Sequence, residues 1–114
     1  LSFFYDINAL WSNYIKPNFR IILLNNKGGG IFRILPGTKA LPHFETFFET
    51  QHNRNAKLVS EDFGFEYNFA DSKEVLEQAL NNFYAITESP KLLEVKTPRE
   101  LNDEILLNFF EYLI

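Results

Sequence analysis

Hydrophobic residues fall in short runs separated by stretches with helical spacing. The first predicted strand, at about 19–24, carries four consecutive apolar side chains at 21–24 and lies between Pro17 and a glycine-rich turn. Such an uninterrupted run is typical of a strand buried on both faces, as in a parallel sheet. A second strand is predicted at 65–69, where aromatic and polar residues alternate as at a sheet edge. A third is predicted at 91–96, directly after a proline.

Helices are predicted between these strands. Asp and Thr are favoured at the first position of a helix, so three such residues are expected to cap the helices that follow them. The expected helices follow Asp6, span 30–36, span 56–63 with Gly64 as the terminating residue, follow Asp71, and follow Thr97. Alternation of strand and helix is characteristic of βαβ units with right-handed crossovers. The predicted fold class is therefore α/β, a parallel sheet with helices on both faces.

Residues 39–53 form the least regular segment. It contains three phenylalanines beside two glutamates, and prolines occur before and within it. Because a loop of this length between regular elements is often functional, it is a candidate lid or substrate loop.

Composition limits the classes of function. A chain of 114 residues with 46% hydrophobic residues and thirteen Phe suits one small folded domain. The net charge of −4 argues against a nucleic-acid binder, which would be basic. The absence of cysteine excludes disulfides and thiol nucleophiles. No apolar run reaches the length of a membrane span, so the expected location is cytoplasmic.

The strongest candidate chemistry follows the first strand. Asn25 and Asn26 end that run, and three glycines follow at 28–30. Ligands of open α/β sheets bind at the carboxyl ends of strands, and amide and carbonyl oxygens are hard ligands suited to Mg²⁺. The residues alone leave a second interpretation open, a glycine-rich turn in which Asn is only a turn former.

These residues also carry a resemblance. Asn25-Asn26 followed by glycines resembles the second half of the thiamine-diphosphate motif, which opens with Gly-Asp about two dozen residues earlier. The Ser-Phe-Phe-Tyr-Asp of residues 2–6, the Gly-Gly-Ile-Phe of 29–32 and Leu35-Pro36 resemble one branch of these enzymes. That branch is the 2-succinyl-5-enolpyruvyl-6-hydroxy-3-cyclohexene-1-carboxylate (SEPHCHC) synthase family of menaquinone biosynthesis, and the resemblance covers essentially the whole chain.

The resemblance implies a thiamine-diphosphate- and Mg²⁺-dependent (or Mn²⁺-dependent) transferase. The reaction decarboxylates 2-oxoglutarate and adds the succinyl unit to isochorismate. Residues 1–114 would be the later half of the diphosphate-binding domain, cut from a longer polypeptide that forms a homodimer or homotetramer. The third protein ligand of the metal, an Asp, would stand immediately before Leu1. The activating Glu would come from another domain, so the isolated piece is expected to be inactive.

The resemblance also assigns residues. No catalytic residue is expected within the chain, and Asn25 is expected to be structural. Ile31, Phe32 and Leu35 are equally compatible with a place in the core. The implied site residues are Asn26 and Gly28 as metal ligands, Ser2, Asn26, Gly28, Ile31 and Phe32 as cofactor contacts, and Leu35 at the substrate entrance.

Arg33 and the two histidines have other expected roles, and two alternative functions fit the sequence. Arg33 could face a dianionic substrate, but a solvated helix position is the expectation. His43 and His52 match no zinc motif and are expected on a surface loop. The alternatives are another thiamine-diphosphate enzyme, similar to acetolactate synthase or pyruvate oxidase, and a flavodoxin-like or receiver-like module that only binds. A receiver would require acidic residues at the strand ends, where this chain has amides and glycines.

The resemblance makes two predictions about the sheet. The last strand should insert between the first and second strands. One flank of the first strand should remain unpaired in this chain.

Overall fold

The computed structural model describes residues 2–113, which form two compact units. Residues up to 25 together with 55–96 form the first, here called the sheet unit. Residues 26–54 together with those from 97 onward form the second, here called the loop unit.

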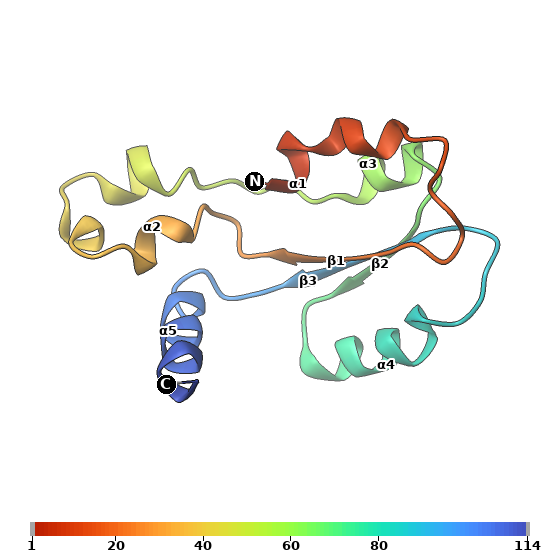
Figure 1. Ribbon diagram of the computed structural model, residues 1–114. Coiled ribbons are helices and arrows are strands. Elements are labelled where there is room, and N and C mark those ends of the chain that lie inside the picture. Colours follow the sequence, from red (N-terminus) through yellow and green to blue (C-terminus); the bar gives the residue numbers. More distant parts are fainter. Residues whose placement is uncertain (1, 114) are drawn as a thin grey trace. The chain divides into compact units, whose positions relative to one another are not determined.

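The sheet unit is built on three parallel strands in the order β1-β3-β2. β1 is Arg20–Asn25, β2 is Glu66–Ala70 and β3 is Lys91–Lys96. The predicted bounds of the third strand are confirmed, and those of the first are shifted by one residue. The central place of β3 and the edge place of β1 are confirmed as well (Figure 1).

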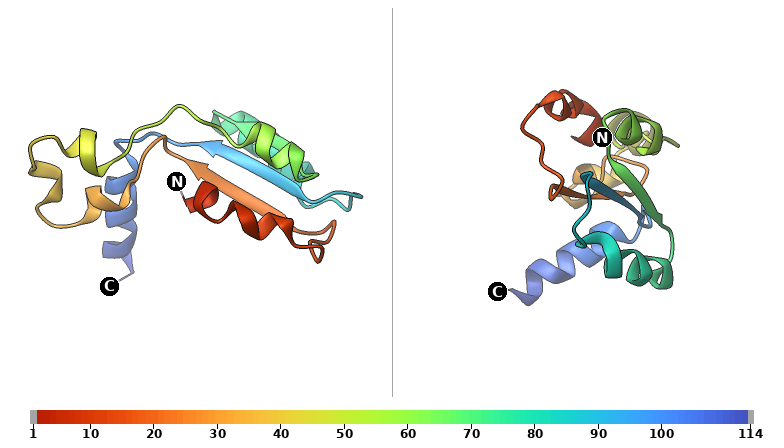
Figure 2. Two further views of the ribbon diagram at one scale, coloured as in Figure 1. Left: turned by 90° about the horizontal axis from the view of Figure 1, so that it is seen from above. Right: turned by 90° about the vertical axis from the view of Figure 1, so that its right-hand side faces the viewer.

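Helices cover both faces of this sheet, which confirms the predicted α/β class (Figures 1 and 2). The 11-residue α4 lies on one face. The N-terminal helices and α3 lie on the other. The bounds are α1 Ser2–Tyr5, the 3-10 helix η1 Ile7–Trp11, α3 Lys57–Asp62 and α4 Lys73–Phe83.

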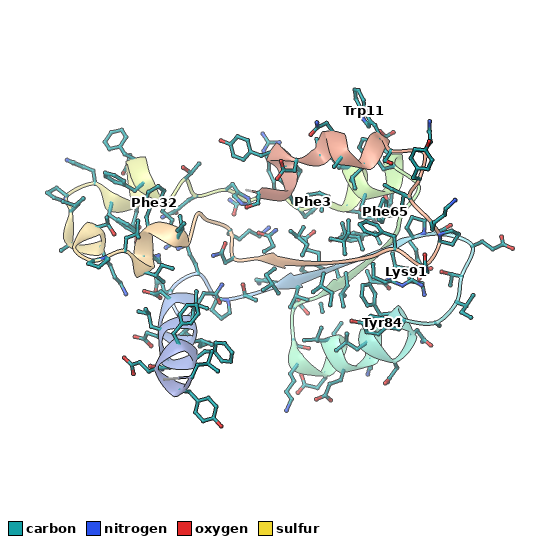
Figure 3. The ribbon with its side chains drawn as sticks, viewed as in Figure 1. Phe3, Trp11, Phe32, Phe65, Tyr84 and Lys91 are labelled. Carbon is teal, nitrogen blue, oxygen red and sulfur yellow. The ribbon has the colours of Figure 1, made fainter. Side chains whose placement is uncertain are left out.

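The core has one cluster on each face because neighbouring residues of β3 point in opposite directions. Leu92 packs with Ala56 and Phe65 beneath the N-terminal helices, whereas Leu93 packs with Ala70 and Phe83 beneath α4. Phe3 and Phe65 point into the first cluster, while Trp11 points outward (Figure 3). The central strand is thus buried on both faces.

The prediction that the first strand is buried on both faces is wrong for this chain. Ile21 and Leu23 pack against the core, but Ile22 and Leu24 are 47% and 67% exposed. α4 packs over β2 and β3, so the α4 side of the edge strand β1 lacks that cover.

Several helix starts differ from those predicted. The cap of α4 is Ser72, whose hydroxyl accepts a hydrogen bond from the Val75 amide at 3.3 Å, and not Asp71. The side chain of Asp6 makes no capping bond, and the helix after it is a 3-10 helix of five residues. The predicted stop after α3 is confirmed, since Gly64 adopts a left-handed φ of 77°.

The loop unit contains short helices and one longer one. They are α2 Ile31–Ile34, the 3-10 helix η2 Thr38–Ala40, the π-helix η3 Phe44–Phe48 and α5 Asn102–Tyr112. The predicted helix over 30–36 is confirmed as α2. The last helix begins at Asn102 and not after Thr97, because the Thr97 hydroxyl accepts a bond from the Asn102 side chain at 2.9 Å. No helix among residues 2–113 is long and apolar enough to cross a membrane.

Candidate functional site

The last residue of β1, Asn25, is tied to the neighbouring strand. Its side-chain Nδ2 donates to Oε1 of Glu94 on β3 at 2.5 Å, and the residue is 7% exposed. The amide therefore bridges two strands of the sheet unit.

Glu94 is a polar centre inside the sheet unit. It is fully buried, and its Oε2 also accepts from the Ala56 amide at 2.8 Å and from the Tyr67 hydroxyl at 2.9 Å. Burial raises the pKa of the Tyr67 phenol above its usual range, and the hydrogen bond and charge of Glu94 add to this effect. Glu94 was not among the predicted site residues, although an acid inside the run Leu92-Leu93-Glu94-Val95 is unusual and indicates a buried polar contact.

Residues 26–30, here called the glycine loop, follow β1 directly and belong to the loop unit. The Asn26 Oδ1 accepts a hydrogen bond from the Gly28 amide at 3.2 Å, which closes an Asx-type turn. Lys27 has a left-handed φ of 62°. A Cβ on Gly30 would lie 2.9 Å from Asn26 Nδ2, so a side chain at that position would require the Asn26 side chain to move.

A second segment, residues 49–54, forms hydrogen bonds with the glycine loop. The carbonyl of Glu49 accepts from the Gly29 amide at 2.5 Å, and the carbonyl of Lys27 accepts from the His52 amide at 3.0 Å. The Lys27 ammonium donates to the Arg54 carbonyl at 2.8 Å. Two of these partners, Glu49 and His52, lie in the irregular segment 39–53 that was predicted as a lid candidate, and Arg54 follows it directly.

The prediction that the Arg33 side chain is solvated is wrong. The residue is 8% exposed, and its Nε and Nη2 donate to the two carboxylate oxygens of Glu49, each at 2.7 Å. The hydrogen bond from Arg33 lowers the pKa of the Glu49 carboxyl below its usual range, although burial opposes this. The partner lies sixteen residues away, so no local pattern could reveal the pair.

The apolar residues after the glycine loop differ in their exposure to solvent. Ile31 and Leu35 are 61% and 43% exposed, so they are not core residues of this chain. Phe32 is half-buried and packs edge-to-face on Phe48, which stacks on Phe44. Ser2 is the exposed first residue of α1 and belongs to the sheet unit.

The histidines lie on the irregular segment, as expected. His43 is exposed and has a left-handed φ of 62°, while His52 is half-buried and its Nδ1 accepts from the Arg54 amide. Within the described residues, no group of three or more His, Cys, Asp and Glu side chains is placed to hold a metal ion.

A second ion pair stabilises the loop unit. The Lys39 ammonium lies 2.7 Å from Oδ2 of Asp103, which is buried at the start of α5. The hydrogen bond from Lys39 lowers the pKa of the Asp103 carboxyl below its usual range, and burial acts in the opposite direction.

We expect this pair to make the loop unit sensitive to acid. A carboxyl whose folded pKa lies below the unfolded value of about 3.9 stabilises the fold fully above about pH 5 and loses this contribution as pH falls through the folded pKa. Denaturant titrations between pH 3 and 7 should show this loss for the native chain. The Asp103→Asn variant should show a flatter profile, and an unchanged profile would contradict the assignment.

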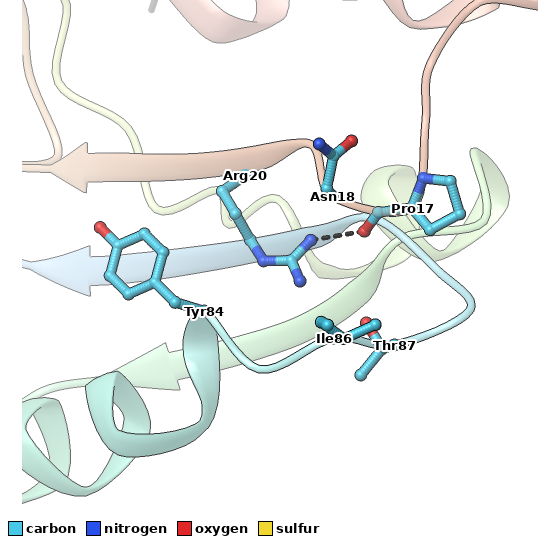
Figure 4. Close-up of a pocket in the computed structure, with 6 residues that line it drawn as sticks. All are labelled: Pro17, Asn18, Arg20, Tyr84, Ile86 and Thr87. Atoms are coloured by element: carbon cyan, nitrogen blue, oxygen red, sulfur yellow. Dashed lines mark hydrogen bonds between the residues drawn. The ribbon is translucent and has the colours of Figure 1, made fainter.

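The sheet unit also has a pocket at the amino ends of its strands (Figure 4). Its volume is about 260 Å³, and Arg20 and Tyr84 are among its lining residues. The Arg20 guanidinium donates to the carbonyls of Pro17, Phe83 and Ala85 at 2.6 to 2.8 Å. Because these bonds occupy the guanidinium, Arg20 has a structural role at this pocket.

The glycine loop remains the best candidate site. Its Asn side chain and closely packed backbone carry neutral oxygens, which are ligands that a hard divalent cation accepts. Asn26 and Gly28 are brought into one turn, and Phe32 follows in the same unit.

No family model matches the chain. Over 113 residues, 99% of the chain, it is 55% identical to 2-succinyl-5-enolpyruvyl-6-hydroxy-3-cyclohexene-1-carboxylate synthase of Christiangramia forsetii. Proteins of the same name from Flavobacterium psychrophilum and Porphyromonas gingivalis are 52% and 42% identical over 99% of the chain. The chain spans about 20% of the length of each relative. These relatives confirm the resemblance inferred from the sequence.

Proposed function

We propose that this chain, which matches about 20% of the length of a SEPHCHC synthase, is part of a thiamine-diphosphate- and Mg²⁺-dependent carboligase of menaquinone biosynthesis. The proposed reaction removes carbon dioxide from 2-oxoglutarate and adds the remaining succinyl unit to isochorismate. The names of the relatives support the reaction. The observation that carries the site is the tight Asn26–Gly30 turn directly after β1.

The residues of the glycine loop fit the proposed metal and cofactor. Asn26 supplies a side-chain oxygen and Gly28 a carbonyl oxygen, and both are hard donors of the type that Mg²⁺ or Mn²⁺ prefers. Gly28 is buried, and a Cβ there would lie 3.0 Å from Glu49, so the backbone approaches its surroundings closely. We therefore propose that Asn26 and Gly28 are metal ligands, as the family resemblance implies.

Other residues would bind and orient. Ile31 and Phe32 would pack against the cofactor, Ser2 would contact its diphosphate, and Leu35 would lie at the substrate entrance. The exposure of Ile31 and Leu35 leaves both side chains available for such contacts. Bound thiamine diphosphate would supply the electron sink for decarboxylation. This chain would hold the cofactor and exclude water, while the activating Glu and the substrate-binding arginines would come from outside it.

The test is an assay of the full-length protein with thiamine diphosphate and Mg²⁺. We expect carbon dioxide release and a coupled product when 2-oxoglutarate and isochorismate are both present. The 114-residue chain alone, as a matched control, should give no turnover. Conversion of pyruvate without isochorismate would instead favour an enzyme similar to acetolactate synthase or pyruvate oxidase. The full-length protein is also expected to be cytoplasmic. It is expected to form a homodimer or homotetramer, and light scattering would measure this oligomeric state.

A further inference from the structure

The buried pair Arg33–Glu49 plays no part in the chemistry proposed above. Both carboxylate oxygens of Glu49 are bound by one guanidinium, and the Glu49 side chain is completely buried. Removing two charges from water is costly, and a bidentate geometry offsets much of that cost. Hydrophobic residues of similar volume are often at least as stabilising as a buried ion pair, so a contribution to stability alone does not explain this pair.

Glu49 contacts the glycine loop through both its backbone and its side chain. Its carbonyl binds the Gly29 amide. A Cβ built on Gly28 would lie 3.0 Å from Glu49 Cγ and 3.1 Å from Oε1. The middle of the loop therefore lies beside the Glu49 side chain, and a shift of that side chain would change the surface against which Gly28 packs.

Arg33 fixes the other end of the same loop. It lies on α2, and its amide donates to the Gly30 carbonyl at 3.0 Å. Its guanidinium also lies 5.3 Å from the centre of the Phe44 ring, and Arg99 approaches Glu49 Oε1 at 3.7 Å. The pair thus joins α2, the middle of the loop and the aromatic segment 44–48.

We propose that Arg33 and Glu49 are positioning residues that hold the glycine loop in the shape from which Asn26 and Gly28 offer their oxygens to a metal-bound diphosphate. Neither side chain needs to touch the ligand. The identity of the ligand rests on the proposed function, whereas the effect on the loop does not.

The test compares Glu49→Gln and Arg33→Lys with Lys39→Met in the full-length protein. Lys39 belongs to another 2.7 Å ion pair of the same unit, with Asp103 as its partner, so it is a matched control. Hydrogen exchange of the Gly28 and Gly29 amides is measured without ligand. Calorimetry measures the Kd for thiamine diphosphate in excess Mg²⁺, and kcat is measured at saturating cofactor.

For Glu49→Gln we expect faster exchange of both amides and a Kd raised on the order of tenfold, the range found for outer-shell partners of metal sites. The kcat at saturating cofactor should stay within about twofold, because the reacting groups are untouched. Lys39→Met should change neither the exchange nor the Kd. If Glu49→Gln does not fold, Arg33→Lys decides, since it keeps the charge but loses the bidentate fork.

Two results separate the possible failures. Unchanged exchange and unchanged Kd in a folded variant would overturn the positioning role. Faster exchange in a protein whose native form binds no thiamine diphosphate would support the hold on the loop and refute the proposed function.

Discussion

Replacing Asn26 with alanine in the full-length protein is expected to raise the Kd for thiamine diphosphate with Mg²⁺ by at least about a hundredfold, beyond the usual effect of outer-shell changes. The change removes a proposed metal ligand and also the acceptor of the Gly28 amide. Asn26→Asp keeps an oxygen at that place and should retain most of the affinity. Calorimetric titration measures both variants.

The matched control is the neighbouring residue of the same type. Asn25 bridges β1 and β3 through Glu94, so Asn25→Ala should lower the stability of the sheet and leave the Kd within a few-fold. A result in which Asn25→Ala abolishes binding and Asn26→Ala does not would refute the assignment of the two amides.

Glu94→Ala is expected to cost about 3–5 kcal/mol of unfolding free energy, because it leaves buried donors without an acceptor. Three donors point at this carboxylate, from Asn25, Ala56 and Tyr67. Denaturant titration of the full chain measures the loss. Glu77→Ala on the exposed side of α4, with a side chain 66% exposed, should cost less than about 0.5 kcal/mol.

A spectroscopic measurement accompanies this prediction. In Glu94→Gln the negative charge beside Tyr67 is lost, so the pKa of the phenol should fall toward its usual value, while burial keeps it elevated. Ultraviolet titration of tyrosine ionisation follows this shift. A Tyr67 pKa that does not move would mean that Glu94 does not act on the phenol.

The strands and their arrangement were the most predictable part of the structure. The run at 91–96 is short, carries Leu92, Leu93 and Val95 between charged residues and is preceded by Pro90, and these local features set its bounds. Gly64 was predictable for the same reason, since a left-handed residue after a helix favours glycine. The central position of β3 came from the family resemblance, because a pattern of apolar residues does not specify which strands pair.

Features that depend on distant residues could not be predicted. The burial of Arg33 requires Glu49, and the choice of Ser72 over Asp71 as cap depends on the backbone geometry at the turn. The start of α5 shifted because Asn102 and Thr97 bind each other. In the candidate site, the sequence pointed to the turn of Asn26 and Gly28, whereas the segment that forms hydrogen bonds with this turn could not be predicted.

The strand order has a consequence for synthesis on the ribosome. β1 and β2 do not touch each other in the sheet, since β3 separates them and is the last of the three to be translated. β1 and β2 therefore leave the ribosome before β3, and their pairing with β3 cannot be complete until Lys96 leaves the exit tunnel. Pairing over such separations is slow, and an unpaired strand can join a neighbouring chain, so this interval is when a chaperone would be most useful.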